Sequence, residues 1–360
     1  ESPAEARDYR LQALRNYASL VPPAKDFPLA RFVSRTDPLT KAVGYDKGAM
    51  VFHMLRRLIG EEDFWGALRD ICRDRLFQPT SWDDLRRGFE QRSRRGLSDF
   101  FDQWVQRRGA PRIHLDVSGD ARPSGGGRVA GRLVQEKPFF DSEVELALET
   151  RAGLRQKTLR LSDASSAFEF TDVSAPKLIS VDPDCHLLRR LEPAEIPPTV
   201  NSLKSSAAAT LVISARASGD GRRLAEVIAR SLGIRNHAIV EEDQIGSSRL
   251  ADRDVIFVGL PNDRKFLSTA PAELRWDERG FALKGLTPAE ADTFFAVLTH
   301  PGDPLRVMAV FLPGPAAAAE TAAAKITHYG RYSYLTFKDG QNREKGSWAV
   351  TRSPVIHRWD

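Results

Sequence analysis

Apolar residues in the first third of the chain recur every three or four positions, a spacing that predicts amphipathic helices. The clearest case is the segment 46–59, where Gly60 is placed to end the helix. Further helices are predicted to begin near Phe64, Ser81 and Ser98. Ser81 stands three residues before Asp84, as the two partners of a capping box do. We therefore predict a helical region over residues 1–111.

After this region the period changes to two, which predicts strands with one buried face. In 113–118, Ile, Leu and Val alternate with polar residues. Similar short segments follow, separated by turns rich in Gly, Pro and Asp, and the full set spans residues 112–118, 128–135, 143–149, 154–161, 168–170 and 178–181. Six short strands at this spacing predict a small β-sandwich over residues 112–195.

A run rich in Pro, Ser and Ala, residues 196–209, is interpreted as a linker. Beyond it, strands and helices alternate. The predicted strands are 210–214, 237–240, 255–259, 305–312 and 332–337, and the predicted helices are 222–232 and 316–325. Such alternation is typical of a parallel sheet flanked by helices. Residues 210–360 are therefore predicted to form an α/β, Rossmann-like domain, and the whole chain to be a multidomain α + β protein.

Composition and charge narrow the classes of function. A chain of 360 residues with 41% hydrophobic and 28% charged residues is expected to fold into two or three domains. The net charge of +5 is small, and positively and negatively charged residues are interspersed along the chain, which argues against nucleic-acid binding. No apolar run approaches the roughly 20 residues of a membrane-spanning helix. Cys72 and Cys185 lie in different predicted domains, so no disulfide is expected.

Most candidate catalytic groups have a simpler structural explanation. None of the seven histidines belongs to an H-E-x-x-H motif, and His53 and His237 are predicted to be packed or capping side chains. The Gly219-Asp220-Gly221 segment lacks the full G-x-G-x-x-G and is predicted to be a strand-to-helix turn. Ser333 lies in the aromatic segment 328–334 without the G-x-S-x-G that a serine hydrolase needs.

Tyr45 differs from these candidates. It lies in Gly44-Tyr45-Asp46-Lys47-Gly48-Ala49-Met50, just ahead of the long predicted helix. A neutral phenol held there can donate a hydrogen bond to a developing oxyanion. By itself, the pattern leaves a purely structural role for Tyr45 open.

Three stretches together resemble the zinc aminopeptidases of the gluzincin class, the family of aminopeptidase N and leukotriene hydrolase. They are the segment 44–55, the segment Ile59-Gly60-Glu61-Glu62-Asp63-Phe64-Trp65, and Asp99-Phe100-Phe101-Asp102-Gln103-Trp104-Val105 followed by Gly109-Ala110-Pro111. The resemblance covers residues 1–198, because the predicted sandwich and the phrase Val181-Asp182-Pro183-Asp184 look like the small domain that follows the catalytic domain. It implies that residues 1–111 are the helical remnant of a metallopeptidase catalytic domain.

The resemblance also implies a role for Tyr45. In that family, zinc is held by H-E-x-x-H and a downstream glutamate, a G-x-M-E-N segment grips the free amine of the peptide, and the tyrosine of a Y-x-K-G phrase hydrogen-bonds the tetrahedral intermediate. Only Y-x-K-G has a counterpart here, and it places Tyr45 in that catalytic role. No cofactor is therefore expected in this chain, whereas zinc and a peptide substrate are expected in the full-length parent.

Two hypotheses follow. In the first, the chain is the C-terminal part of a zinc aminopeptidase-like protein, inactive by itself, as a first residue Glu1 rather than Met also suggests. In the second, it is a non-catalytic binding module derived from a peptidase, with ligand recognition by the α/β domain. The sequence leaves open the substrate preference, the oligomeric state and the compartment, which could be the cytoplasm or a bacterial cell envelope.

Overall fold

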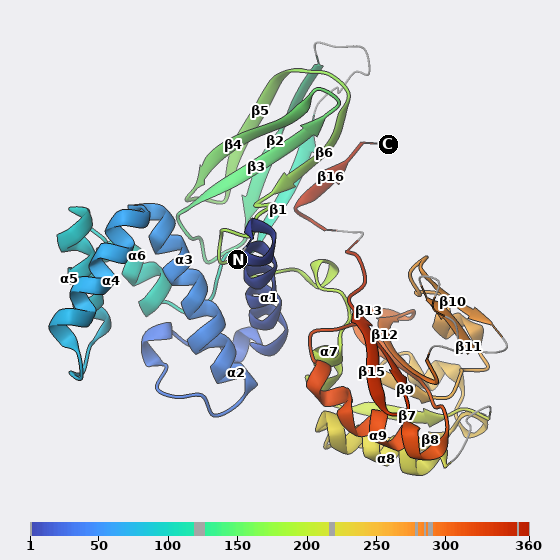
Figure 1. The fold of residues 1–360 in the computed structure, drawn as a ribbon. Coiled ribbons are helices and arrows are strands. Elements are labelled where there is room, and N and C mark those ends of the chain that lie inside the picture. The colour runs from blue at the N-terminus through green and yellow to red at the C-terminus, as the bar shows by residue number, and fades with distance from the viewer. Residues whose placement is uncertain are drawn as a thin grey trace. The chain divides into compact units, whose positions relative to one another are not determined.

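Consecutive helices form the first part of the chain. The structure is a computed structural model that describes residues 2–118, 127–215, 220–277, 280–283, 286, 291–350 and 353–359. The helices are α1 (Pro3–Leu20), α2 (Pro38–Lys41), α3 (Gly48–Ile59), α4 (Glu61–Arg75), α5 (Trp82–Ser93) and α6 (Ser98–Phe101). In Figure 1, α3, α4 and α5 follow one another as neighbouring helices. The chain divides into two units, residues 1–195 with 352–360, and residues 196–351.

Local signals explain where several of these helices begin and end. Ser81 Oγ accepts a hydrogen bond from the backbone N–H of Asp84, and the Asp84 carboxylate accepts one from the backbone N–H of Ser81. The predicted capping box is thus confirmed. Gly60 ends α3 with φ at +91°, a value that residues with a Cβ rarely adopt. A π-helical turn, Ala42–Lys47, joins α2 to α3 without a break.

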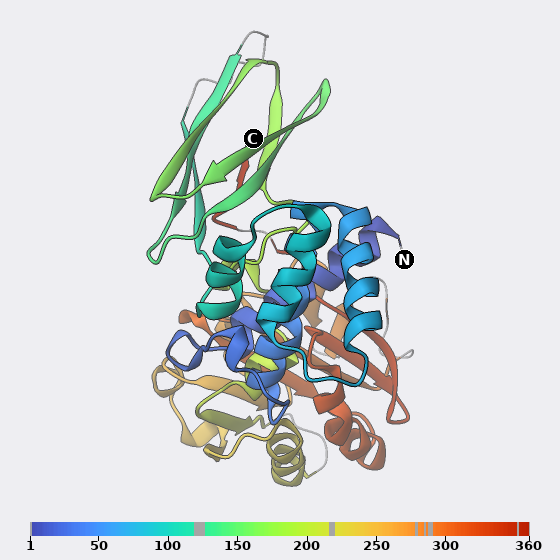
Figure 2. The same ribbon diagram turned by 90° about the vertical axis from the view of Figure 1, so that its left-hand side faces the viewer.

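Two antiparallel sheets complete the first unit. They are built from β1 (Ile113–Ser118), β2 (Gly127–Gln135), β3 (Ser142–Thr150), β4 (Gly153–Leu161), β5 (Ser165–Val173), β6 (Pro176–Val181) and β16 (Ile356–Arg358). One sheet has the order β1-β2-β5 and the other β16-β6-β3-β4. Alternate residues of β2 are buried, as the period of two requires. These strands are drawn mainly in green in Figure 2.

The position of strand β16 corrects the predicted domain boundary. The sequence pattern assigns all of residues 210–360 to the α/β domain, but β16 pairs with β6 of the first unit, with Ile356 opposite Ser180. Figure 1 shows this strand, in red, beside β6 near the C-terminus. A strand of three residues is too short to carry a periodic signal, so the sequence pattern did not reveal it.

The second unit contains one seven-stranded sheet. Its strands are β7 (Ala209–Ile213), β8 (His237–Glu241), β9 (Asp254–Val258), β12 (Thr293–His300), β13 (Asp303–Leu312), β14 (Tyr334–Lys338) and β15 (Gln341–Gly346), in the order β15-β14-β12-β13-β9-β7-β8. Helices α8 (Gly221–Leu232) and α9 (Ala316–Lys325) pack on one face, with α7 (Val200–Lys204). The hairpin β10 (Leu274–Asp277) and β11 (Gly280–Leu283) packs on the other.

This sheet is only partly the parallel sheet that we predicted. β8, β7, β9 and β13 run parallel, whereas β12, β14 and β15 add antiparallel pairs. Strand β12 was not predicted, because both of its faces are covered and its apolar run therefore shows no alternation. The segment interpreted as a linker contains α7 and the first residue of β7, so much of it is regular structure. The chain as a whole is a mixed α and β protein with several sheets.

In the part of the chain that the structure describes, no helix combines the length and the apolar character needed to cross a bilayer.

Candidate functional site

Tyr45 lies in the π-helical turn between α2 and α3 and points to solvent. Its exposed fraction is 57%, whereas Asp46 and Lys47, its next two neighbours, are buried. A π-helical turn widens the helix and changes the direction in which successive side chains point, and such turns are frequent at functional sites. The structure thus presents the one residue of the Y-x-K-G phrase whose side chain could reach a ligand.

The ring of Phe32 supports Tyr45. The two ring centroids are 5.7 Å apart and the rings meet edge to face at 79°. A Cβ at Gly44 would stand only 2.3 Å from the Phe32 ring. Gly44 therefore leaves the space that Phe32 needs to pack against the turn and to contact Tyr45.

Lys47 fixes the turn from beneath. Its side chain is 0% exposed, and its Nζ donates hydrogen bonds to the backbone carbonyls of Arg107 at 3.4 Å and Gly109 at 3.2 Å. The ammonium also lies 5.8 Å from the centre of the Tyr17 ring. Burial lowers the pKa of Lys47 to about 8.

Asp26 connects the same carbonyl segment to α1. Its carboxylate accepts hydrogen bonds from the Tyr17 hydroxyl and from the backbone N–H of Gly109, the latter at 3.0 Å. Burial, reinforced by the Asp26 charge, raises the pKa of Tyr17, so this phenol stays protonated. Two stretches that carry the family resemblance, the Y-x-K-G phrase and the segment beginning at Gly109, are thereby held in contact.

Two of the other matching residues, Phe64 and Trp104, have packing roles. Phe64 stacks on Phe89 with centroids 5.4 Å apart, and Trp104 packs against Phe140 at 5.2 Å. Trp65 is exposed and donates its indole N–H to Glu61 at 2.7 Å. Phe64 thus stabilises the packing of α4 on α5, and Trp104 contacts the segment before β3.

Apart from His53, the remaining sequence candidates belong to the second unit. His237 Nδ1 lies 2.9 Å from the carbonyl of Ile234, as expected of a structural histidine. Ser333 is fully buried, and its hydroxyl accepts a hydrogen bond from the backbone N–H of Trp348. Gly219 lies outside the described residues, and Asp220 caps α8 through the backbone N–H of Arg223.

The structure reveals a histidine pair that the sequence did not predict. His53 on α3 and His186 in the segment after β6 lie with Nε2 and Nδ1 2.9 Å apart. Arg56 donates to Nδ1 of His53 at 3.1 Å, so the proton of His53 is on Nε2 and is donated to His186. Burial lowers the pKa of His53 to about 3 and also lowers that of His186. Both rings are neutral at pH 7. No local motif marks this pair, because 133 positions separate its members.

One group in the described part of the chain has the composition of a metal site. Glu145, Asp184 and His186 place one ligand atom each within 4.8 Å of one another. However, Arg57 already pairs with the Glu145 carboxylate, and Nδ1 of His186 accepts the hydrogen bond from His53. The group contains no residue of the turn that holds Tyr45.

Comparisons with known proteins give a distant relationship. No protein-family model matches the chain. Aminopeptidase N of Lactococcus lactis subsp. lactis is 29% identical over 104 residues, which are 29% of this chain and 11% of that protein. Aminopeptidase M1-C of Oryza sativa subsp. japonica is 30% identical over 86 residues, 24% of this chain and 10% of that protein.

A solved structure, that of Legionella pneumophila aminopeptidase A in complex with aspartic acid, aligns with 18% identity and a TM-score of 0.35. The alignment covers 47% of this chain and 19% of that one. The chain spans about a tenth of the length of the curated relatives it matches. Over about a quarter of its own length, it is thus distantly homologous to aminopeptidases of the N and M1 type.

Proposed function

We propose that this chain forms part of an aminopeptidase-like catalytic domain, in which Tyr45 donates a hydrogen bond to the oxyanion formed when a peptide carbonyl is attacked. The observation that carries the proposal is the contrast within the Y-x-K-G phrase. Tyr45 is 57% exposed, while Lys47 beside it is 0% exposed and hydrogen-bonded to two carbonyls. A preorganised donor costs no reorganisation at the moment of reaction, which is what oxyanion stabilisation requires.

The residues of this chain do not fit a zinc site beside Tyr45. The sequence has no H-E-x-x-H. Within the described ranges, the only group of three possible metal ligands is Glu145, Asp184 and His186, and it contains no residue of the π-helical turn. We therefore assign any zinc of the intact enzyme to residues outside this sequence, and we derive no catalytic step through a metal.

Tyr45 contributes to the proposed reaction through the fixed orientation of its ring and through the proton that its hydroxyl donates in a hydrogen bond. The edge of the Phe32 ring limits the rotation of the Tyr45 ring, and the turn beneath is fixed by Lys47. The hydroxyl can then meet negative charge on a substrate oxygen as the carbonyl becomes tetrahedral. A hydrogen bond that strengthens only in the transition state raises turnover without tightening substrate binding.

Hydrolysis of an alanyl anilide by the full-length protein and by the isolated 360-residue chain tests this proposal. We expect hydrolysis by the full-length protein alone, and no stoichiometric zinc in the isolated chain. Hydrolysis by neither would favour the non-catalytic binding module. Peptidase activity together with stoichiometric zinc in the isolated chain would overturn the proposal that the zinc ligands lie outside this sequence.

A further inference from the structure

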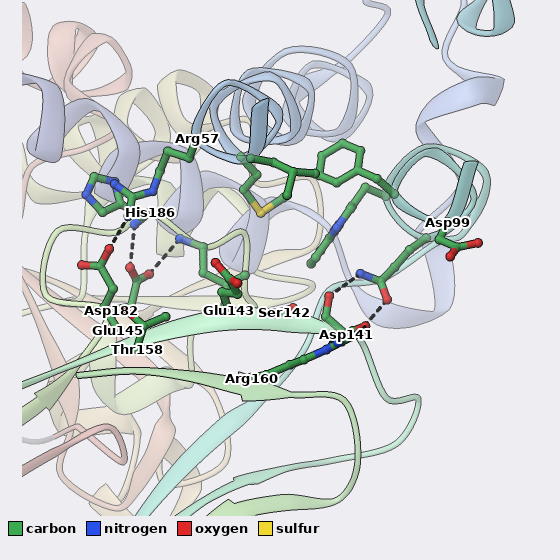
Figure 3. A pocket seen from close by; sticks show the side chains of 16 residues that line it. Arg57, Asp99, Asp141, Ser142, Glu143, Glu145, Thr158, Arg160, Asp182 and His186 are labelled. Carbon is green, nitrogen blue, oxygen red and sulfur yellow. Dashed lines mark hydrogen bonds and ion pairs between the residues drawn. The ribbon is translucent and has the colours of Figure 1, made fainter. Parts of the chain in front are cut away.

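A cavity of about 390 Å³ lies within the first unit, away from the turn that holds Tyr45. Figure 3 shows its lining side chains, which come from α3, from α6 and the turn after it, from β3 and β4, and from the segment 182–187. The volume is within the range of small-molecule sites. Because a helix rises about 1.5 Å per residue, Leu58 in the cavity wall lies roughly 20 Å along the helical axis from Tyr45.

One part of the cavity wall is apolar. Met54 and Leu58 come from α3, Phe100 and Trp104 from the α6 region, and Leu187 from the segment after β6. Leu58 is 41% exposed, so part of its apolar surface is not covered by the chain itself. Aromatic and aliphatic surface of this kind favours a ligand with an apolar body.

The other part of the wall carries an excess of negative charge. Five carboxylates line the cavity, and they belong to Asp99, Asp141, Glu143, Glu145 and Asp182. Only two arginines oppose them, and each is already paired, Arg160 with Asp141 at 2.9 Å and Arg57 with Glu145. His186 adds no positive charge, because burial lowers its pKa.

Two of these carboxylates have no such partner. Among the described residues, the side chains of Asp99 and Glu143 make no hydrogen bond or ion pair, although Arg160 is close enough to feel the charge of Glu143. Asp182 is satisfied differently, since it accepts the backbone N–H groups of His186 and Leu187 at 2.7 and 3.0 Å. Figure 3 shows Glu143 projecting from β3 among the other lining side chains, whereas Asp99 lies at the edge of the cavity, so a ligand cation would find its partner at Glu143.

From this charge complementarity we infer that the cavity binds a small organic cation, a free monoamine whose ammonium group is joined to an aromatic or aliphatic body. The ammonium donates to the Glu143 carboxylate, and the apolar body packs against Phe100, Trp104 and Leu58. The ammonium thus contacts the acidic part of the wall, and the apolar body contacts the apolar part. This inference does not depend on the proposed peptidase function.

Isothermal titration of the chain with phenethylamine tests the inference. We expect saturable one-to-one binding with a dissociation constant of about 1 mM or tighter, the range open to so small a ligand. Phenethyl alcohol, a neutral analogue of similar shape, should bind at least about 10-fold more weakly. Equal affinity for the alcohol and the amine, or no saturable binding up to about 10 mM amine, would overturn the inference.

Matched variants identify the site. The double variant Asp99→Asn/Glu143→Gln should weaken phenethylamine binding at least about 10-fold, because both free carboxylates are lost. Glu149→Gln removes an exposed carboxylate of the same strand β3 outside the cavity and should leave the affinity within about 2-fold. If the double variant and Glu149→Gln bind alike, the inference is wrong.

A variant in the apolar wall keeps the test independent of how well the double variant folds. Leu58→Lys places a cation at a half-exposed position, where substitution is expected to be tolerated, and should abolish binding by like-charge repulsion. Thermal unfolding confirms that each variant is folded before titration. Binding to Leu58→Lys as tight as to the wild type would place the amine elsewhere and overturn the inference.

Discussion

The ring of Phe32 lies edge-on against the ring of Tyr45, with centroids 5.7 Å apart, and fills the space that a side chain at Gly44 would occupy. The orientation of an exposed tyrosine is thus set by a glycine directly before it in sequence and by an aromatic ring from an earlier segment. Gly44 and Tyr45 belong to the stretch that resembles the aminopeptidases. Phe32 is a positioning residue that the family resemblance did not identify.

Gly44→Ala is expected to destabilise the protein by about 1 kcal/mol, because the new Cβ would meet the Phe32 ring and the ring must move. In a Phe32→Ala background the same change should be neutral or stabilising, since alanine is the better helix former. Urea unfolding of the four proteins measures this coupling.

Gly96→Ala serves as the control for this cycle. A Cβ at Gly96 has no atom within 4 Å, so its effect should be small and equal in both backgrounds. An effect of Gly44→Ala that does not change when Phe32 is removed would show that the ring is not what excludes the side chain.

Lys47→Met tests the buried ammonium beneath the turn. The pKa of Lys47 is lowered from 10.5 to about 8 by burial, so between these values the unfolded chain holds a proton that the folded chain has released. The free energy of unfolding of the wild type should therefore rise with pH across this window, by about 2 kcal/mol at pH 10 relative to Lys47→Met. Below pH 8 the difference should be constant.

Urea unfolding of both proteins at pH 7.5 and pH 10 measures this shift. Comparing the two proteins cancels the other groups that titrate in alkali. If the free energy of unfolding of the wild type does not rise relative to that of Lys47→Met between pH 7.5 and pH 10, burial does not lower the pKa of Lys47.

His53→Gln tests the histidine pair. The pKa of His53 is lowered from 6.5 to about 3, so between these values the unfolded chain takes up a proton that the folded chain does not. Wild-type stability should fall as the pH drops below 6.5, by roughly 1–2 kcal/mol at pH 5 relative to His53→Gln. Unfolding midpoints in urea at pH 7 and pH 5 provide the measurement.

Asp182, which lies near the same histidine pair, has the opposite effect on how stability depends on pH. Burial raises the pKa of this carboxyl to about 6, so stability from Asp182 is lost as the pH rises from 3.8 to 6. Because Asp182 is present in both proteins, its own titration cancels in the difference between them, which reports on His53 together with its partner His186. Equal acid sensitivity of the wild type and His53→Gln would contradict a neutral, buried imidazole.

Local signals in the sequence predicted much of the secondary structure. The long apolar helix, the Ser81 capping box and the six short strands of the first unit follow from spacing and capping residues alone. Strand β12 is buried on both faces and β16 has only three residues, so neither shows the alternation that reveals a strand. The pairing of β16 with β6 brings together segments far apart in the chain, which no local pattern encodes.

The candidate site was predictable only in part. The resemblance singled out Tyr45, but the sequence could not show that Lys47 is buried against the carbonyls of Arg107 and Gly109. It also could not show that His53 meets His186, since that contact depends on how the segment after β6 packs on α3. Contacts between segments distant in the sequence determine the surroundings of Lys47 and His53, whereas capping signals and periodicity depend only on residues that are close in the sequence.

Steady-state kinetics of Tyr45→Phe in the full-length protein, with an alanyl anilide as substrate, test the role of the phenol most directly. Tyr9→Phe is the matched control, because Tyr9 is also exposed, at 66%, but lies on α1 outside the Y-x-K-G phrase. We predict that Tyr45→Phe lowers kcat at least about 100-fold with KM changed by less than about 3-fold, and that Tyr9→Phe changes neither. A Tyr45→Phe enzyme that retains the wild-type kcat would contradict the assignment of Tyr45 as the oxyanion donor.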